Sequence, residues 1–152
     1  IAFWRYGRRM SWLRRPTKIG YSSFKSPRPE GAGESTEAYN TVLYERLERY
    51  MAQEERFRDP ECNLSLVARE LGTNVSYLSR AVNQGSGTNF RGYLNNWRIE
   101  TAKKELINLD GSQTVAEVGY NVGYKSPSVF TRVFKEAVGL PPKAFSRPLA
   151  GH

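Results

Sequence analysis

Apolar side chains recur every three to four residues in two long segments of the chain, and this spacing is typical of amphipathic helices. The first segment runs from Thr36 or Glu37 to about Arg56, and the second from Asn89 to about Asn108. We predict a long helix in each segment, the second of them about 30 Å in length. The apolar positions are Tyr39, Val42, Leu43, Leu47, Tyr50 and Met51 in the first segment and Phe90, Tyr93, Leu94, Trp97, Ala102 and Leu106 in the second.

Between these segments the pattern predicts two short helices joined by a tight turn, which together form a helix-turn-helix unit. Asn63 can cap the first short helix, and Gly72 can adopt the left-handed conformation that ends it. The second begins after Thr73 or Asn74 and extends to about residue 83, before a Gly-Ser-Gly sequence. Its residues expected to face a core are Val75, Leu78 and Val82, and those expected to be exposed are Ser76, Tyr77, Ser79, Arg80 and Asn83.

The residues after the second long segment predict a second helix-turn-helix unit. Thr114 and Glu117 have the spacing of a capping box, and the short helix that they start is expected to end at Gly123. Ser126 can cap the next helix, and Pro127 suits its first position because no backbone N–H is needed there. The residues of that helix expected to face a core are Val129, Phe130, Val133 and Phe134, and those expected to be exposed are Ser128, Thr131, Arg132 and Lys135. The remaining signals are Val115, Val118 and Val122 in the preceding helix, Gly139 at the end of this one, and Pro141 with Pro142 at a final turn near Phe145 and Ser146.

An internal repeat relates the two helix-turn-helix units. The first contains Val67-Ala68-x-x-Leu71-Gly72 and the second Val118-Gly119-x-x-Val122-Gly123. Arg80 follows the first turn glycine after eight residues, and Arg132 follows the second after nine. Core packing does not require arginine at this position, whereas an exposed arginine can bind guanine through two hydrogen bonds in the major groove of DNA. The repeat therefore favours DNA as the partner over the alternative, an all-helical bundle with solvated surface charges.

Residues 37 to 147 resemble the DNA-binding domain of AraC/XylS-type transcription regulators of bacteria. The residues that carry the resemblance are Val118, Gly123-Tyr124, Ser126, Ser128, Phe130-Thr131-Arg132, Phe134-Lys135, Gly139, Pro142 and Phe145 in the second unit and Tyr93-Leu94, Arg98-Ile99 and Ala102 in the long helix before it. The resemblance implies an all-α fold of seven helices, in which a long linking helix joins two helix-turn-helix units. It also implies a transcription regulator, usually an activator, that binds double-stranded promoter DNA and carries a sensing or dimerisation region upstream of Ile1.

The chain departs from the family pattern at three positions. Gly119 stands where the family commonly has alanine, which costs the helix up to about 1 kcal/mol and can loosen the second unit. Pro127 has no side-chain donor, so base recognition is expected to fall on the polar residues that follow it. The closing Arg147 comes one residue later than usual after Phe145.

The candidate DNA-contacting residues lie on the exposed faces of the second helix of each unit. For base contacts we select Ser76, Tyr77, Ser79 and Arg80 in the first unit and Ser128, Thr131 and Arg132 in the second. For phosphate contacts we select Lys125, Ser126 and Lys135, together with the helix N-termini. With a linking helix of about 30 Å, the two recognition helices would enter successive major grooves about 34 Å apart.

Each of these assignments has an alternative. Tyr77 would instead pack on the linking helix, Lys135 would be a solvated charge, and Arg80 and Arg132 would form surface ion pairs. For the whole domain, the alternative function is a module that binds a protein partner, such as RNA polymerase or a sensor, and has only non-specific affinity for DNA. The first long helix would face such a partner.

The formal net charge of +8 arises from the N-terminal segment. Residues 1–28 contain eight Lys or Arg residues and no acidic residue, interleaved with aromatic side chains. A linker rich in Pro and Gly follows over 26–36, so we divide the chain into an arm and linker over 1–36 and a domain over 37–152. Three interpretations of the arm are open: a flexible tail, a segment that binds an anionic membrane surface, and a basic arm that contacts DNA phosphates.

The cysteine and histidine counts limit the chemistry of the chain. With Cys62 and His152 as the single residues of each kind, the chain has no internal disulfide, no Cys/His metal site and no histidine-based triad. We therefore expect neither enzyme activity nor a bound metal or cofactor. No run of eighteen or more apolar residues occurs, and we expect a cytoplasmic domain, either free or at the cytoplasmic end of a membrane-anchored parent protein.

Overall fold

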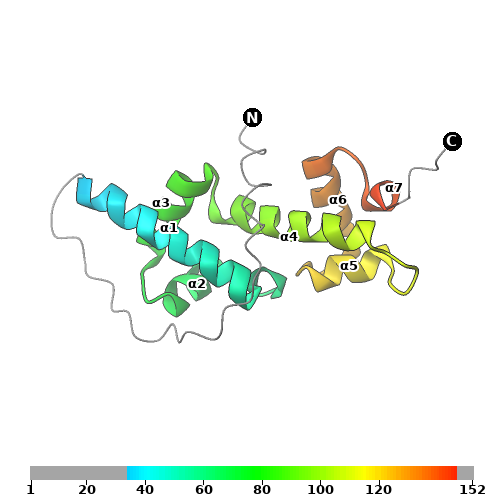
Figure 1. The fold of residues 1–152 in the computed structure, drawn as a ribbon, viewed down its shortest axis with the longest axis horizontal. Coiled ribbons are helices and arrows are strands. Elements are labelled where there is room, and N and C mark those ends of the chain that lie inside the picture. Colours follow the sequence, from blue (N-terminus) through cyan, green and yellow to red (C-terminus); the bar gives the residue numbers. More distant parts are fainter. Residues whose placement is uncertain (1–33, 147–152) are drawn as a thin grey trace. The chain divides into compact units, whose positions relative to one another are not determined.

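The computed structural model describes residues 34–146, in which it contains seven α-helices, one 3₁₀ helix and no β-strand (Figure 1). The helices are α1 (Glu34–Glu54), α2 (Leu64–Glu70), α3 (Val75–Ser86), α4 (Phe90–Ile107), α5 (Val115–Asn121), α6 (Pro127–Val138) and α7 (Pro142–Phe145), and the 3₁₀ helix is η4 (Arg56–Arg58). The prediction of an all-α fold with seven helices is confirmed. The predicted arm over 1–28 and the closing Arg147 lie outside the described residues.

The described chain forms two subdomains. The first subdomain consists of residues 34–56 and 63–90 and contains α1, α2 and α3. The second consists of residues 57–62 and 91–146 and contains almost all of α4 together with α5, α6 and α7. The segment 57–62 thus belongs to the second subdomain although α1 precedes it and α2 follows it in the sequence.

Helix α3 is the centre of the first subdomain, because α1 and α2 both pack against it. The buried apolar side chains are Leu43, Leu47 and Met51 from α1, Val67, Ala68 and Leu71 from the α2 region, and Leu78, Ala81 and Val82 from α3. Helix α3, the second helix of the first helix-turn-helix unit, is therefore held from two sides.

Contacts near the end of α3 fasten it to α1. Asn40 Nδ2 donates a hydrogen bond to Gln84 Oε1 at 3.0 Å. Gly85 lies against the ring of Tyr44, and a Cβ atom at this glycine would stand 2.4 Å from the ring carbons. The prediction that the Gly-Ser-Gly sequence ends the helix is wrong at Gly85, which lies inside α3 because its missing side chain leaves room for the ring. The helix ends at Gly87, which has the left-handed φ of 74°.

The core of the second subdomain joins α4 to α5 and α6. Its buried side chains are Ile99, Ala102, Leu106, Val118, Val122, Tyr124, Phe130 and Phe134. Segment 57–62 is attached to this subdomain through Phe57, whose ring stacks on that of Trp97 with 5.5 Å between the centroids. Cys62, at the end of the segment, is buried as well.

Helix α1 differs from its predicted extent at both ends. It begins at Glu34 rather than at residue 36 or 37, and it ends at Glu54 rather than near Arg56. The early end has a local cause, since Glu55 has a φ of 47°, a left-handed conformation that no α-helix can continue through. The following residues form η4 instead.

Three of the residues predicted to lie on an apolar, core-facing stripe are exposed, and those predictions are wrong. Val42 in α1 is 56% exposed, Val75, the first residue of α3, is 43% exposed, and Val129 in α6 is 40% exposed. Val75 and Val129 lie near the start of their helices, at the edge of the apolar stripe. The buried faces are formed by residues further along, Leu78 and Val82 in α3 and Phe130 and Phe134 in α6.

Candidate nucleic-acid interface

The two helix-turn-helix units have turns of the same construction. After α2, Gly72 has a φ of 67°, and the N–H of Thr73 donates to the carbonyl of Ala68 at 2.9 Å. After α5, Gly123 has a φ of 105°, and the N–H of Tyr124 donates to the carbonyl of Gly119 at 3.0 Å. These hydrogen bonds close the C-terminal ends of α2 and α5, so the chain leaves both helices in the same way.

The recognition helices α3 and α6 also begin in the same way. Asn74 caps α3 by accepting a hydrogen bond from the N–H of Tyr77 at 2.9 Å. Ser126 caps α6 by accepting one from the N–H of Val129 at 3.3 Å. The N-caps predicted from the sequence at Asn63, Ser126 and the Thr114 capping box are confirmed. The second turn is one residue longer than the first, which accounts for the different spacing from the turn glycine to the arginine.

Counting from the N-cap places the predicted base-contacting residues in one register. The second residue after the cap is Ser76 in α3 and Ser128 in α6, the fifth is Ser79 and Thr131, and the sixth is Arg80 and Arg132. All of these side chains are exposed except that of Ser79, which is half-buried. Each recognition helix therefore presents the same order of hydroxyl groups and a guanidinium on its outer side.

Tyr77 is half-buried and has its aromatic partner on α1. Its ring meets that of Tyr39 edge-on, with 5.4 Å between the centroids. The hydroxyl group of Tyr39 is also 3.4 Å from that of Thr73 in the turn before α3. Tyr77 therefore packs on a neighbouring helix, as the alternative proposed. The neighbour found here is α1, whereas the alternative named the linking helix.

The two arginines differ in their immediate surroundings. Arg80 is exposed and makes no ion pair with any residue between 34 and 146. Arg132 Nη1 lies 3.5 Å from Glu136 Oε1, one helical turn further along α6, and both side chains are more than half exposed. Exposed pairs of this kind contribute little and are easily broken. The alternative of a surface ion pair therefore applies to Arg132, but its guanidinium stays available to a ligand.

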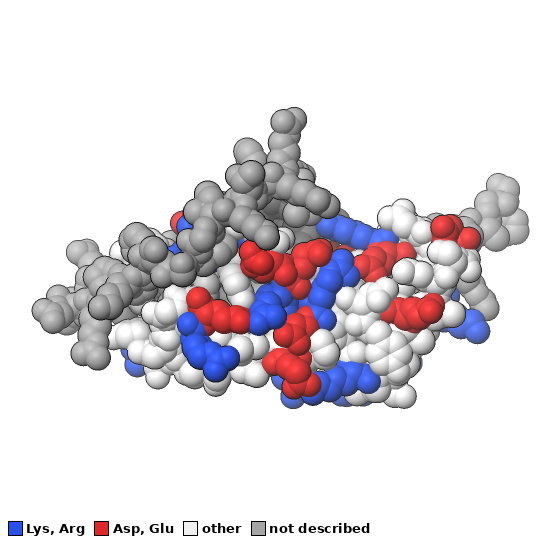
Figure 2. All heavy atoms as spheres, turned by 90° about the horizontal axis from the view of Figure 1, so that it is seen from below, with Lys and Arg blue, Asp and Glu red and all other residues white. Residues whose placement is uncertain are grey.

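The residues predicted to contact phosphates lie at the start and on the outer side of α6. Lys125 Nζ is 2.6 Å from Glu61 Oε1, and both side chains are largely exposed. Ser126 Oγ accepts the capping hydrogen bond and still has its own O–H to donate. Lys135 is exposed. Figure 2 shows basic and acidic side chains next to one another on the described part of the face that it presents.

Arg98 supports the second turn from inside the second subdomain, a role that the sequence did not reveal. Its Nε donates to the carbonyl of Phe57 at 2.7 Å and its Nη2 to that of Asp59 at 2.9 Å. The guanidinium also lies over the ring of Tyr124, 5.3 Å from the centroid. Burial lowers the pKa of Arg98 and raises the pKa of Tyr124 to about 12. The available signal was the match of Arg98 to the family pattern, which gave no partner for it.

Gly123 is required by this packing as well as by its backbone conformation. A Cβ atom at Gly123 would stand 2.5 Å from the carbonyl oxygen of Phe57 and 2.8 Å from Arg98 Nε. The turn before α6 therefore rests directly on segment 57–62 and on the buried guanidinium. Tyr124, the next residue, donates from its hydroxyl group to Asn95 Oδ1 at 3.1 Å and fixes the turn to α4.

Gly119 has a packing role that the sequence did not indicate. It is buried in α5, and a Cβ atom there would stand 2.7 Å from Cδ1 of the Phe130 ring. Phe130 is fully buried, and its ring contacts those of Tyr124 and Phe134. The glycine therefore lets α6 approach α5 closely, so the structure gives a reason for it beyond the lower helix propensity expected from the sequence.

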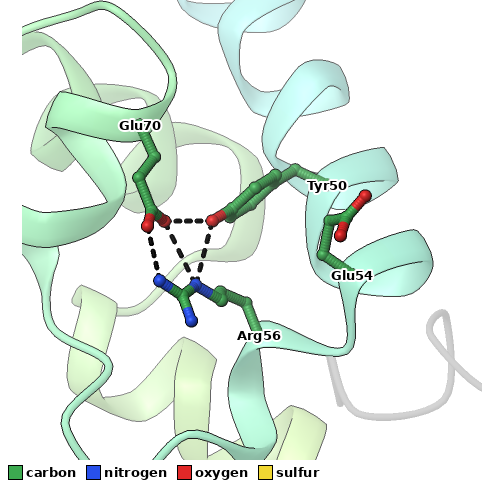
Figure 3. A pocket seen from close by; sticks show the side chains of 4 residues that line it. All are labelled: Tyr50, Glu54, Arg56 and Glu70. Atoms are coloured by element: carbon green, nitrogen blue, oxygen red, sulfur yellow. Dashed lines mark hydrogen bonds and ion pairs between the residues drawn. The ribbon is translucent and has the colours of Figure 1, made fainter. Parts of the chain in front are cut away.

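A small surface hollow in the first subdomain is lined by polar side chains from α1, η4 and α2 (Figure 3). The hydroxyl group of Tyr50 and the guanidinium of Arg56 both donate hydrogen bonds to the carboxylate of Glu70. The hydrogen bond from Arg56 is the largest cause of the lowered pKa of Glu70. Because these groups satisfy one another, they brace the end of α1 against α2.

Two further observations concern the described residues as a whole. None of their helices is both long and apolar enough to cross a membrane. Between residues 34 and 146 there is no group of three or more His, Cys, Asp or Glu side chains that could hold a metal ion.

A family model and curated relatives both match this chain, and they indicate the same family. A family model described as a helix-turn-helix domain matches residues 67–148. YesN of Bacillus subtilis, described as an uncharacterized transcriptional regulatory protein, is 30% identical over 120 residues, which cover 77% of this chain. The chain spans 32% of the length of YesN and between 11% and 50% of that of the other curated relatives compared.

Solved structures show the same fold. The C-terminal domain of AraT, a response regulator from Geobacillus stearothermophilus, has a TM-score of 0.63 and 25% identity, and the match covers 72% of this chain and 91% of that one. The DNA-binding domain of AdpA, solved in complex with a target DNA, has a TM-score of 0.59 and 20% identity over 68% of this chain and 88% of that one. The resemblance proposed from the sequence is thus confirmed. The chain belongs to the AraC-type helix-turn-helix family of transcription regulators, as a DNA-binding domain and not an enzyme.

Proposed function

We propose that α3 and α6 are recognition helices that enter two successive major grooves of promoter DNA. The observation that carries this proposal is their common register, in which a serine, a second hydroxyl residue and an arginine follow each N-cap at the same positions. Helix α4 has 18 residues, or about 27 Å, and successive major grooves of B-DNA lie about 34 Å apart. One chain would then bind two sites one helical turn apart, with no need for a palindrome.

In this arrangement the two arginines supply most of the base discrimination. Arg80 and Arg132 would each donate two hydrogen bonds to a guanine, which is a common specific contact in the major groove. The neighbouring hydroxyl groups of Ser76, Ser128 and Thr131 would bond base edges or phosphates. Ser79 and Tyr77 belong to the same proposed set, with smaller exposed areas.

The phosphate contacts are proposed for the start and the outer side of α6. Lys125, Ser126 and Lys135 carry donors there, and the backbone N–H of Ser128 adds one more at the start of the helix. When Lys125 binds a phosphate it must leave Glu61, at little cost because the pair is exposed.

The test uses DNA duplexes that the chain itself selects from a random library, followed by affinity measurements on the selected and on scrambled duplexes. Arg80→Ala and Arg132→Ala are each expected to cost about 1 to 3 kcal/mol on the selected duplex and much less on the scrambled one. Arg49→Ala is the matched control, because Arg49 is an exposed arginine on α1. Lys135→Ala is expected to weaken both duplexes alike and to reduce the salt dependence of binding.

Two outcomes contradict the proposal. If an arginine variant loses the same affinity on both duplexes, that arginine contacts phosphate and does not recognise a base. If selection yields no preferred sequence and all binding is strongly salt-sensitive, the alternative function is supported, namely a module that binds a protein partner and has only non-specific affinity for DNA.

We infer from the family that the parent protein activates transcription in the cytoplasm, with RNA polymerase as a partner and with a sensing or dimerisation region upstream of Ile1. A reporter gene under a promoter that contains the selected sequence tests this inference. Expression should rise when the parent protein is present; a fall would indicate a repressor. Residues upstream of Ile1 that form membrane spans would make the parent protein a membrane-anchored regulator.

For the arm over residues 1–28 two binding roles are proposed, at an anionic membrane surface or at DNA phosphates, beside the alternative of a tail that binds neither. Sedimentation with vesicles of anionic lipid, with and without residues 1–28, distinguishes the two. Equal sedimentation of the chain with and without the arm excludes the membrane, and salt-dependent loss of DNA affinity on removing the arm supports the phosphates.

A further inference from the structure

Val129 is a partly exposed apolar residue of α6, at the edge between the buried stripe and the outer side of the helix. Its side chain is 40% exposed, whereas Phe130, the next residue, is fully buried. The partly buried apolar residues that pack on the core of the second subdomain are Leu109, Val115, Val133, Val138 and Phe145, and Val129 is not one of them. Contacts with the core therefore do not account for the exposed part of this valine.

The start of α6 does not explain it either. Val129 contributes its backbone N–H to the cap formed by Ser126, and any residue other than proline would do the same. Valine is moreover a weaker helix former than alanine, because its branched side chain loses rotamers in a helix. The isopropyl group is thus available for a contact outside the chain.

The neighbours of Val129 on the helix surface are the side chains proposed to contact bases. Arg132 lies three residues further along α6, a spacing that places two side chains side by side on a helix. Ser128 precedes Val129 and is exposed, as Arg132 is. A ligand that engages Ser128 and Arg132 from outside would also cover the isopropyl group.

The major groove offers one apolar group at its base edges, the 5-methyl group of thymine. We propose that Val129 contacts this methyl group and so selects a thymine in the part of the site bound by α6. The inference rests on the proposed insertion of α6 into a major groove. It adds a specificity-determining residue that forms no hydrogen bond and acts only through apolar contact.

The corresponding position in α3 has a different residue. Tyr77 is the third residue after its N-cap, as Val129 is after Ser126, but its ring is occupied by the edge-on contact with Tyr39. The two recognition helices therefore share their serine and arginine and differ at this position. A difference of this kind allows the two halves of the DNA site to have different sequences although the arginines are equivalent.

The test removes the methyl group from the DNA and the isopropyl group from the protein. Thymines of the selected duplex are replaced one at a time by deoxyuridine, which lacks only the 5-methyl group. At one thymine in the part bound by α6, the unmodified chain is expected to bind about fourfold more weakly, as loss of one buried methyl group predicts. Val129→Ala should lose a similar factor on the thymine duplex and show no further loss with deoxyuridine there.

Two other variants serve as controls. Val129→Ile keeps an apolar contact at the same place and should remain sensitive to the methyl group. Val42→Ala makes the same change at an exposed valine of α1 and should behave as the unmodified chain does on both duplexes. Circular dichroism of all variants checks that the helices are retained.

The outcomes separate this inference from the function on which it rests. If no duplex is preferred over scrambled DNA, the proposed function fails and the inference with it. If a duplex is preferred but no deoxyuridine in the part bound by α6 weakens binding, or if Val129→Ala remains as sensitive to deoxyuridine as the unmodified chain, the inference about Val129 is wrong while the recognition helices stand.

Discussion

We expect the replacement of Arg98 to destabilise the second subdomain more than the replacement of any other charged residue of α4. The side chain donates two hydrogen bonds to the carbonyl groups of Phe57 and Asp59, and it is buried. Arg98→Ala leaves both carbonyl groups without these donors. Each loss costs about 1 to 3 kcal/mol, and the contact of the guanidinium with the ring of Tyr124 adds about 1 kcal/mol.

The burial of the charge acts in the opposite direction. Because burial lowers the pKa of Arg98, part of the hydrogen-bond energy is offset by desolvation of the guanidinium, and alanine removes that cost. We therefore expect a net loss of about 3 kcal/mol for Arg98→Ala. Arg98→Lys keeps the charge but lacks the planar set of donors, so its expected loss is about half as large.

The assay is urea unfolding of the whole chain, followed by tryptophan fluorescence. Trp97 stacks on Phe57 and reports this region directly once Trp4 and Trp12 have been changed to phenylalanine. Arg91→Ala is the control, because Arg91 is an exposed arginine of the same helix and should change stability by less than about 0.5 kcal/mol. If Arg98→Ala is no less stable than Arg91→Ala, the two hydrogen bonds do not support the turn as argued.

Three further changes test other parts of the fold. Gly119→Ala gains about 1 kcal/mol of helix propensity, but it forces the buried ring of Phe130 aside, which costs about 1 to 3 kcal/mol. Thermal unfolding should therefore show a net loss of stability, and the double variant G119A/F130L should recover it. A single variant that is more stable than the unmodified chain would contradict the packing argument. Glu70→Gln should lose about 1 kcal/mol of stability at neutral pH. Because the pKa of Glu70 is lowered in the fold, its carboxylate stabilises the fold above the unfolded pKa, and the difference from the unmodified chain should shrink as the pH falls below that value and vanish below the folded pKa; a difference independent of pH would refute the assignment. Glu55→Gly should raise the free energy of unfolding by about 0.5 to 1 kcal/mol, and with it the melting temperature, because glycine adopts the left-handed backbone without strain. The control Glu54→Gly, at the last residue of α1, should lower the melting temperature; the same sign for both would show that backbone strain is not the cause.

The features that the sequence predicted well are those that depend on neighbouring residues. The caps at Asn63, Thr114 and Ser126 each bond an N–H group three residues away, so residue type and spacing are sufficient to find them. The glycines that end α2 and α5 were also found locally, because a left-handed φ is sufficient to end a helix, whereas the packing of Gly123 on segment 57–62 was not foreseen. The internal repeat likewise indicated two equivalent recognition helices from residue types and spacing alone.

The features that the sequence did not predict depend on residues far apart in the chain. Gly85 lies inside α3 because of Tyr44, which is on another helix, and the role of Arg98 depends on carbonyl groups about forty residues earlier. Val129 was assigned to the core because helical spacing locates an apolar stripe but not its edge. For the same reason, the sequence predicted the exposure of Arg80 and Arg132 correctly and that of Val129 wrongly.

Segment 57–62 has a consequence for how such a domain can be divided or recombined. A gene fragment that encodes α4 to α7 alone would leave out the carbonyl groups to which Arg98 donates, and a fragment that ends before α4 would leave the segment without its tryptophan partner. A chimera that exchanges the second recognition helix between two regulators must therefore carry residues 57–62 along with α4 to α7. The two subdomains alternate along the chain, so a single cut in the gene does not separate them.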